Sequence, residues 1–257
     1  MRRETFAVAG RLRLDLKVPA GEVEVEAVEG GEAVVELESL RGDERVVEDA
    51  RIELRGDELR VEVRDRAGRA EVALRVTAPA GSVLTASTAS ADLTARGSFG
   101  EAELKSASGD LELDRVAALR VKSASGDLHA GQVDGEARVQ IASGDVELAR
   151  VAGHAEISAA SGDVRVGEAE AGVKVQSASG DQRVDSVAAG PVELTSASGD
   201  VRVGIRRGSR VFIDARSASG DVESELEVGE ALVDDEGPLV ELKVTTMSGD
   251  IALVRAE

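Results

Sequence analysis

One tripeptide, Ser-Gly-Asp, recurs at a nearly constant interval and constrains the fold more than any other feature of this sequence. It occurs eight times, with Ser at positions 108, 125, 143, 161, 179, 198, 219 and 248. The spacings are 17, 18, 18, 18, 19, 21 and 29 residues, and a degenerate copy, Ser90-Ala91-Asp92, lies 18 residues before the first. A fixed period of this length indicates a repeat architecture, in which each unit packs on its neighbours.

The residues that flank the tripeptide alternate between apolar and polar, as half-buried strands do. An apolar residue stands four positions before every Ser, and another stands three positions after Ser in all copies except the one with Gln182. A second glycine closes most units: Gly135, Gly153, Gly172, Gly190 and Gly208. Each unit therefore contains a strand, a Ser-Gly-Asp turn, a second strand and a glycine turn, and it has no room for a crossover helix.

Two all-β architectures fit this unit. In a β-solenoid (β-helix), equivalent strands of successive coils stack in parallel, whereas in an antiparallel meander Ser-Gly-Asp would be a hairpin turn. Stacking rewards identical turns, so we predict a solenoid of about nine coils of ~18 residues, each with two short strands.

The first part of the chain lacks the tripeptide but shows the same alternation, with turns such as Pro19-Ala20-Gly21 between the apolar runs. Because the end of a solenoid exposes unpaired strand edges, we predict that residues 1–85 form a β-rich N-terminal cap that is continuous with the solenoid. Residues 86–257 are then the Ser-Gly-Asp repeat solenoid, and the whole chain is one structural unit.

The glycines of the repeated turn are expected to take positive φ, which residues with a Cβ rarely adopt. These structural turn residues are Gly109, Gly126, Gly144, Gly162, Gly180, Gly199, Gly220 and Gly249. Stacking would also place eight carboxylates in one column: Asp110, Asp127, Asp145, Asp163, Asp181, Asp200, Asp221 and Asp250. Asp favours tight turns by hydrogen bonding to nearby backbone, which is the preferred interpretation. Calcium binding by this column is the alternative, because calcium prefers carboxylate oxygens; otherwise we expect no metal and no cofactor.

Composition limits the classes of binding partner and the cellular location that we expect for this chain. The formal net charge is −19, and residues 86–257 carry 31 acidic and 17 basic side chains. Such a surface repels phosphate backbones, so we expect no nucleic acid partner. No stretch approaches 18 apolar residues and the N-terminal apolar run is too short for a signal peptide, so we expect no integral membrane segment and a cytoplasmic location.

The segment Val76-Thr77-Ala78-Pro79-Ala80-Gly81-Ser82, the degenerate copy at Ser90 and the Ser-Gly-Asp repeats together resemble a bacterial family of β-strand repeat proteins, the putative-adhesin domain of unknown function. The resemblance covers essentially the whole chain. It implies a β-solenoid in an envelope-associated setting, and it implies no catalytic residues.

We therefore predict a non-enzymatic structural or protein-interaction scaffold of adhesin-like type, which binds a protein partner or associates with itself through the faces or ends of the solenoid. No repeat stands out as specialised, whereas an active site would break the pattern, so we expect no catalytic residues. Two alternatives remain open. One is the cation-binding solenoid described above, and the other is an acidic β-helix that mimics DNA.

Overall fold

The computed structural model describes residues 1–42, 44–65, 70–226 and 237–256, and nearly all of their regular structure is β-strand. The one helix among them, α1 (Arg45–Glu48), has four residues. No helix in these ranges has the length and apolar character needed to cross a membrane. The chain divides into two compact units, Met1–Ala130 and Gly131–Glu257.

The strands of the first unit are β1 (Arg2–Ala7), β2 (Arg13–Val28), β3 (Glu32–Arg41), β4 (Arg51–Arg55), β5 (Glu58–Glu62), β6 (Glu71–Pro79), β7 (Val83–Ser106) and β8 (Leu111–Ser123). β2 pairs in parallel with β7, and β7 pairs in parallel with β8. The register places Ala20-Gly21-Glu22 opposite Ser90-Ala91-Asp92. β2 is therefore a coil of the same kind as the repeats, with Ala-Gly-Glu where they have Ser-Gly-Asp, and the parallel stack already begins at residue 13, within the segment expected as a cap.

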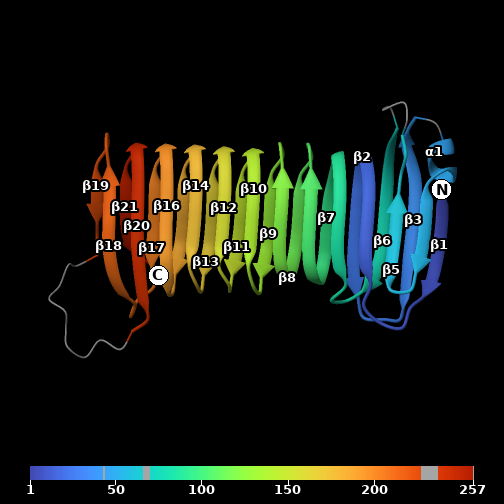
Figure 1. Ribbon diagram of the computed structural model, residues 1–257, viewed down its shortest axis with the longest axis horizontal. Helices are drawn as coiled ribbons and strands as arrows, with labels where there is room; N and C mark the ends of the chain where they lie inside the picture. The colour runs from blue at the N-terminus through green and yellow to red at the C-terminus, as the bar shows by residue number, and fades with distance from the viewer. Residues whose placement is uncertain (43, 66–69, 227–236, 257) are drawn as a thin grey trace. The chain divides into compact units, whose positions relative to one another are not determined.

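Antiparallel strands end this stack. β5 and β6 both pair in parallel with β2. Beyond them, β4 pairs with β5, β3 with β6, and β1 with β3, and these three pairings are antiparallel. The chain thus changes from parallel to antiparallel pairing on the side of the first unit where β1 lies (Figure 1).

Ser82 fixes the point where the chain enters β7. Its side chain is fully buried, and its hydroxyl donates to the carbonyl oxygen of Pro79 at 2.6 Å. The hydroxyl oxygen also accepts the backbone N–H of Leu12 at 3.0 Å. One hydroxyl therefore satisfies two buried backbone groups, which explains the Ser after Pro79-Ala80-Gly81.

In the second unit, the strands before the Ser-Gly-Asp turns form one parallel ladder and the strands after the turns form another. The first ladder contains β10 (Ala137–Ser143), β12 (Ala155–Ser161), β14 (Val173–Ser179), β16 (Gly190–Ser198), β18 (Arg210–Ser217) and β20 (Leu239–Ser248). The second contains β11 (Val146–Val151), β13 (Val164–Ala169), β15 (Gln182–Val187), β17 (Val201–Ile205), β19 (Val222–Ser224) and β21 (Ile251–Arg255). β9 (Leu128–Val133) spans the boundary between the units. The parallel pairing confirms a solenoid-like fold and rules out the antiparallel meander.

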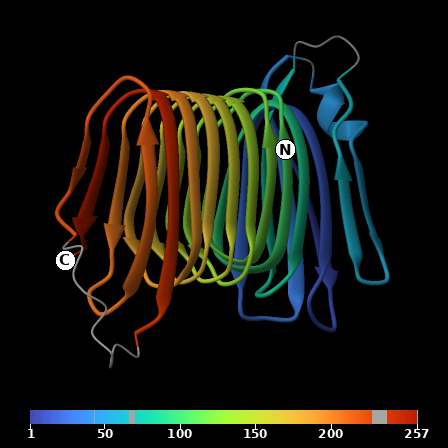
Figure 2. The ribbon, with the colours of Figure 1, turned by 60° about the vertical axis from the view of Figure 1, so that its left-hand side comes forward.

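The last two coils do not stack in chain order. β16 pairs with β20, and β20 pairs with β18. On the opposite side β17 pairs with β21, and β21 pairs with β19. The final coil, β20–β21, therefore lies between β16–β17 and β18–β19, as the red strands between orange ones show (Figures 1 and 2).

The core of the second unit consists of stacked aliphatic residues. Val139, Ile157 and Val175 occupy equivalent positions in successive coils, and each is at most 1% exposed. Gln182, the exception in the apolar pattern, is also buried. Its Nε2 donates to Ser177 Oγ at 2.8 Å and to the carbonyl oxygen of Thr195 at 2.9 Å, so both of its donor hydrogens are used inside the coil.

Candidate functional site: an arginine-lined groove on the second unit

The Asp residues of the repeated turn connect one coil to the next. In the second unit, each Oδ1 accepts the backbone N–H of the Asp in the following coil at 2.8 Å, in the order Asp145, Asp163, Asp181, Asp200, Asp250, Asp221. In the first unit, Asp92 and Asp110 accept from Asp110 and Asp127 in the same way, at 2.9 Å. All these side chains lie at the surface. One carboxylate oxygen per turn therefore serves the backbone of the neighbouring coil.

The turn glycines combine positive φ with close backbone contact. All eight have φ between 100° and 149°. At Gly180, a Cβ would lie 2.1 Å from the carbonyl oxygen of Gly162 in the preceding coil. Glycine is thus required both by the φ angle and by the distance between stacked turns.

No group of three or more His, Asp or Glu side chains is arranged to hold a metal ion within the described part of the chain. Calcium binding by the Asp column therefore stays a prediction.

Outward-facing side chains of the first ladder form a column in which charge alternates from strand to strand. This alternating column contains Arg138, Glu156, Lys174, Glu193, Lys243 and Asp214, in spatial order. Arg138 Nε lies 2.9 Å from Glu156 Oε2, and Lys174 Nζ lies 3.5 Å from Glu193 Oε2. Each of these charges has an oppositely charged neighbour in register, as cross-strand pairs favour.

The second ladder breaks this rule. Arg165, Arg183 and Arg202 stand side by side on β13, β15 and β17, and the register pairs each with the next. We call these three residues the arginine column. Neighbouring strands lie about 4.8 Å apart, so three like charges in register repel one another unless anions neutralise them.

The arginine column lines a groove of about 650 Å³ on the outer surface of the second unit. Its other lining residues include Ala149, Gly167, Asp185 and Gly204. A Cβ at Gly204 would lie 2.0 Å from the carbonyl oxygen of Asp185, and one at Gly167 would lie 2.3 Å from that of Ala149. Parts of the groove floor are therefore bare backbone, because side chains are excluded there by the spacing of the strands.

Two acids lie within reach of the arginine column. Glu147 Oε1 lies 3.6 Å from Arg165 Nη1, and Asp185 lies on β15 where the register against β17 is irregular. Between Val184 and Val187 the register of β15 against β17 shifts, so that Asp185 and Ser186 together oppose Gly204. Bulges of this kind redirect side chains. Asp185 Oδ2 accepts hydrogen bonds from Arg165 Nε and Nη2 at 3.0 and 2.9 Å, and its Oδ1 accepts from Arg183. Burial raises the pKa of Asp185, but the hydrogen bonds from Arg183 and Arg165 outweigh it and hold this pKa below its ordinary value.

Arg202 has no such partner. Neither Arg202 nor Arg255, which also lines the groove, forms an ion pair or a side-chain hydrogen bond with any described residue. Arg202 is exposed, and its neighbour across β21 is Ala252 rather than an acid.

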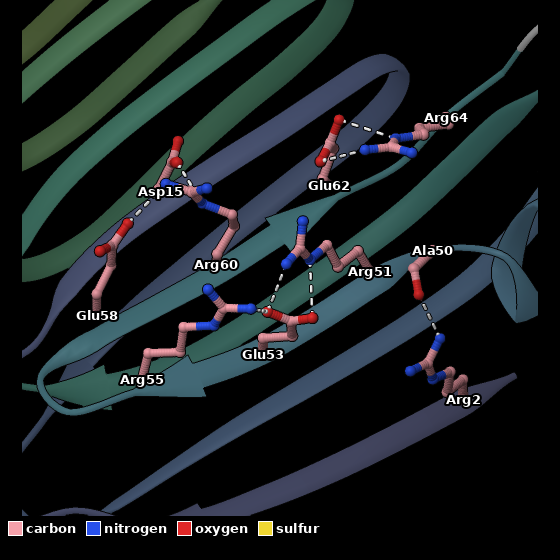
Figure 3. Close-up of polar contacts among 10 residues, drawn as sticks. All are labelled: Arg2, Asp15, Ala50, Arg51, Glu53, Arg55, Glu58, Arg60, Glu62 and Arg64. Atoms are coloured by element: carbon pink, nitrogen blue, oxygen red, sulfur yellow. Dashed lines mark hydrogen bonds and ion pairs between the residues drawn. The ribbon is translucent and has the colours of Figure 1, made fainter.

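The charged cluster of the first unit behaves differently (Figure 3). Arg51 and Arg55 both reach Glu53, at 2.8 and 2.9 Å, and Arg60 Nε lies 2.9 Å from Asp15 Oδ2. The hydrogen bond from Arg51 lowers the pKa of Glu53. This cluster is internally neutralised, which makes the unpaired Arg202 the more distinctive feature.

The arginine column can be found in the sequence, but only at a position whose residue type varies among the repeats. Arg165, Arg183 and Arg202 each stand four residues after the Ser of their repeat, where the other copies have Glu112, His129, Glu147, Glu223 or Ala252. Three successive repeats are therefore specialised at a position that varies elsewhere, and the expectation of uniform repeats does not hold on this face.

A family model described as Toastrack DUF4097 matches residues 13–254. No curated protein matches the sequence. A Bacteroides fragilis protein described as a putative adhesin aligns with a TM-score of 0.51 at 13% identity, over 98% of this chain and 96% of its own. A Parabacteroides merdae protein with the same description gives 0.47 at 11%, over 98% and 95%, and a Parabacteroides distasonis protein described as a putative lipid binding protein gives 0.44 at 13%, over 98% and 96%. The first of these similarities supports the fold alone.

Proposed function

The chain belongs to the Toastrack DUF4097 family, and on that premise we propose that it is a non-enzymatic interaction scaffold that binds a second copy of itself through the edge strand β18 of its second unit. The function proposed is association, as the resemblance to adhesin-like repeat proteins implies.

The observation that carries this proposal is the open edge of β18. Among the described residues, β18 pairs with β20 and with no other strand. Val211 and Ile213 point toward the core, opposite the fully buried Val240 and Leu242, yet both are only half-buried. Phe212 on the outer face is 67% exposed. An unpaired edge with apolar residues on it is a template for another strand.

A second copy has the chemistry to fill this edge. Two β18 strands related by a two-fold axis run antiparallel. If the pairing is centred on Phe212, Val211 of one copy lies opposite Ile213 of the other, which extends the core. Arg210 then lies opposite Asp214, so the charges on the outer face are complementary.

The shifted pKa values are consistent with a non-enzymatic role. The lowered pKa values of Glu53, Glu62 and Glu170 each have an arginine hydrogen bond as their largest cause, on the outside of strands. Ion pairs of this kind are typical of solvated sheet surfaces and give no group the raised or matched pKa of a general acid or base.

Sedimentation velocity over a wide range of protein concentration tests the proposal. We expect a concentration-dependent dimer that Phe212→Asp converts to monomer, while Leu40→Asp, at another exposed apolar residue in the first unit, leaves it intact. A wild-type protein that remains monomeric at every concentration up to about 100 μM would overturn it, since weak but specific association falls within that range.

Charge exchange tests the pairing itself. Arg210→Glu and Asp214→Arg should each weaken self-association, because each places like charges opposite one another. An equimolar mixture of the two variants should associate again, because both cross-copy pairs then have opposite sign. The same weak association in the mixture as in each variant alone would contradict this register.

The remaining expectations are not carried by a particular observation. A cytoplasmic location, calcium binding by the Asp column and DNA mimicry stay predictions. DNA mimicry requires continuous negative charge over a face. The Asp column supplies one such line, whereas the two outward columns of the strands carry alternating charge or arginine.

A further inference from the structure

We infer that Arg202, together with the neighbouring Arg183 and the bare backbone at Gly204, forms a binding site for a carboxylate group supplied from outside the chain. This site is separate from the β18 edge, so a test of carboxylate binding does not depend on whether the chain associates with itself.

The first argument is the contrast between the two outward columns of the second unit. In the alternating column, every charged side chain has an oppositely charged neighbour in register, and Glu193 serves both Lys174 and Lys243. In the arginine column, three guanidinium groups stand in register in a chain with a net charge of −19. Where acids are so abundant, three adjacent arginines call for an explanation other than surface solvation.

The second argument is that the chain itself shows what this column binds. Asp185 bridges Arg165 and Arg183, and Arg165 contacts it through two nitrogens at 3.0 and 2.9 Å. Both nitrogens donate to the same oxygen, Oδ2, while Oδ1 accepts from Arg183, so each carboxylate oxygen serves one guanidinium group. Charge-assisted hydrogen bonds of this kind are roughly twice as strong as neutral ones. The first two arginines therefore share a carboxylate that β15 itself supplies.

The third argument is that the next coil has no acidic side chain at the position opposite Asp185. The residue opposite Asp185 and Ser186 is Gly204, which has no side chain and has no space for one. The acid that would serve Arg202 is therefore missing, and the space it would occupy belongs to the groove. The guanidinium group of Arg202 therefore has no ion pair among the described residues and lies beside the exposed backbone of Gly204.

The lining also limits the ligand. Glu147, Glu168 and Glu225 border the same groove. These acids repel a ligand that carries many negative charges, such as a nucleic acid or polyphosphate. A single carboxylate, from an acidic side chain of a polypeptide or from a small organic acid, matches a groove in which Arg202 and Arg255 have no ion pair among the described residues and three glutamates limit the negative charge of the ligand.

The site is tested by titrating the full chain at about 0.15 M salt, where long-range repulsion is largely screened. The probes are succinate and a blocked pentapeptide with a single glutamate, and the readout is the Nε–H resonance of Arg202. We expect saturable shifts with both probes, and at least a tenfold weaker affinity in Arg202→Gln by calorimetry. A blocked peptide with glutamine in place of glutamate should give no shift.

Arg138→Gln is the matched control, since it removes the same charge from an exposed strand position outside the groove. It should bind both probes as the wild type does. Tighter binding of the peptide identifies a polypeptide side chain as the source of the carboxylate, and tighter binding of succinate identifies a small acid.

Three results would overturn the inference. They are the absence of any Arg202 shift with either probe up to about 10 mM, equal affinity in Arg202→Gln and the wild type, and inorganic phosphate binding as tightly as the carboxylates. Since Arg202 has no intramolecular partner among the described residues, Arg202→Gln should keep the wild-type urea midpoint, which separates loss of binding from loss of folding.

Discussion

Lys243 Nζ lies 3.6 Å from Glu193 Oε1, although the whole β18–β19 coil separates the two residues in the chain. The contact exists because β20 lies directly against β16. In chain order, Asp214 of β18 would stand beside Glu193, and two acids would face each other. The observed order restores alternation, since Lys243 lies between Glu193 and Asp214.

Burial favours the same order. Val240, Leu242 and Val244 of β20 are at most 1% exposed, whereas the β18 residues opposite them are only half-buried. By residue type the core-facing side chains of the two strands differ mainly where Val244 of β20 lies opposite Ala215 of β18, so the strand with the larger apolar side chain occupies the interior position. Exposed cross-strand charge pairs contribute about 0.2–1 kcal/mol each and a buried methylene group about 0.8 kcal/mol, so the two effects are of similar size and favour the same order.

The order of the last coils can be checked by disulfide cross-linking, because the chain has no cysteine of its own. Thr195 and Thr245 are outward-facing neighbours, whereas Thr195 would neighbour Arg216 if the coils stacked in chain order. We expect Thr195→Cys/Thr245→Cys to cross-link under mild oxidation, as seen by non-reducing electrophoresis and mass spectrometry. Preferential cross-linking of Thr195→Cys/Arg216→Cys would refute the inserted coil.

Gly→Ala substitutions at two turns should separate two contributions to the free energy of unfolding. One is the strain of a positive φ in a residue with a Cβ, and the other is the clash of that Cβ with the neighbouring coil. Gly180 has φ +115° and lies against the backbone of Gly162, while Gly208 has φ +84° and open space, with nothing within 4 Å of where a Cβ would lie. We expect Gly208→Ala to lower the free energy of unfolding by about 1 kcal/mol and Gly180→Ala by more than ~2 kcal/mol. Urea unfolding measures both, and equal effects would mean that stacking contact does not constrain the turn.

The Asp column should tolerate loss of charge better than loss of its acceptor oxygen. Asp181 Oδ1 accepts the N–H of Asp200 at 2.8 Å. Asp181→Asn keeps an acceptor and should change the free energy of unfolding little, while Asp181→Ala should lower it by about 0.5–1.5 kcal/mol. The same proteins serve a calcium titration. Heat at millimolar calcium that is lost in Asp181→Asn would support cation binding, and a flat titration of the wild type would exclude it.

The bulge carboxylate should make stability depend on pH in the acid range. Since the pKa of Asp185 is lowered in the folded protein, its contribution is present above the unfolded value of about 3.9 and is lost as pH falls through the folded value. Asp185→Asn should therefore lower the urea midpoint at pH 7, by about 1 kcal/mol in free energy, and this deficit should be smaller at about pH 3, where the contribution of the carboxylate is being lost.

Glu241→Gln is a matched control for this pH dependence, since Glu241 is exposed and has no ion pair among the described residues. It should follow the wild type at both pH values. An Asp185→Asn deficit of the same size at pH 7 and at about pH 3 would show that the ion pairs with arginine are not its cause.

Much of the fold was accessible from the sequence because stacking imposes the same demands on every coil. The period, the alternation and the glycine in each turn together predict parallel coils, and the pairing of β10 to β17 confirms that solenoid-like fold. The coil formed by β2 was missed because stacking tolerates Ala20-Gly21-Glu22 in place of Ser-Gly-Asp, and only Gly21, with φ +117°, keeps the required geometry.

The coil order and the groove were harder to predict for a different reason. All coils carry the same turn, so the tripeptide does not specify which coil lies beside which; that information is in variable positions such as Glu193 and Lys243. The register shift at Asp185 arises because β17 has one residue between Val203 and Ile205 where β15 has two between Val184 and Val187. The spacing of the tripeptide did not signal it, since the extra residue between Ser179 and Ser198 lies between Val187 and Val192. Both features depend on differences between repeats, whereas the period and the alternation reflect what the repeats have in common.

The inserted final coil also has a consequence for synthesis on the ribosome. As the chain emerges, β18–β19 is complete before β20–β21 has been made, and the edge of β16–β17 is then its only stacking surface in the described part of the second unit. If β18–β19 stacks on that edge before β20–β21 emerges, it must leave the edge again so that β20–β21 can occupy it. In that case we expect completion of this unit to include a strand exchange, whose rate depends on how readily β18 leaves β16.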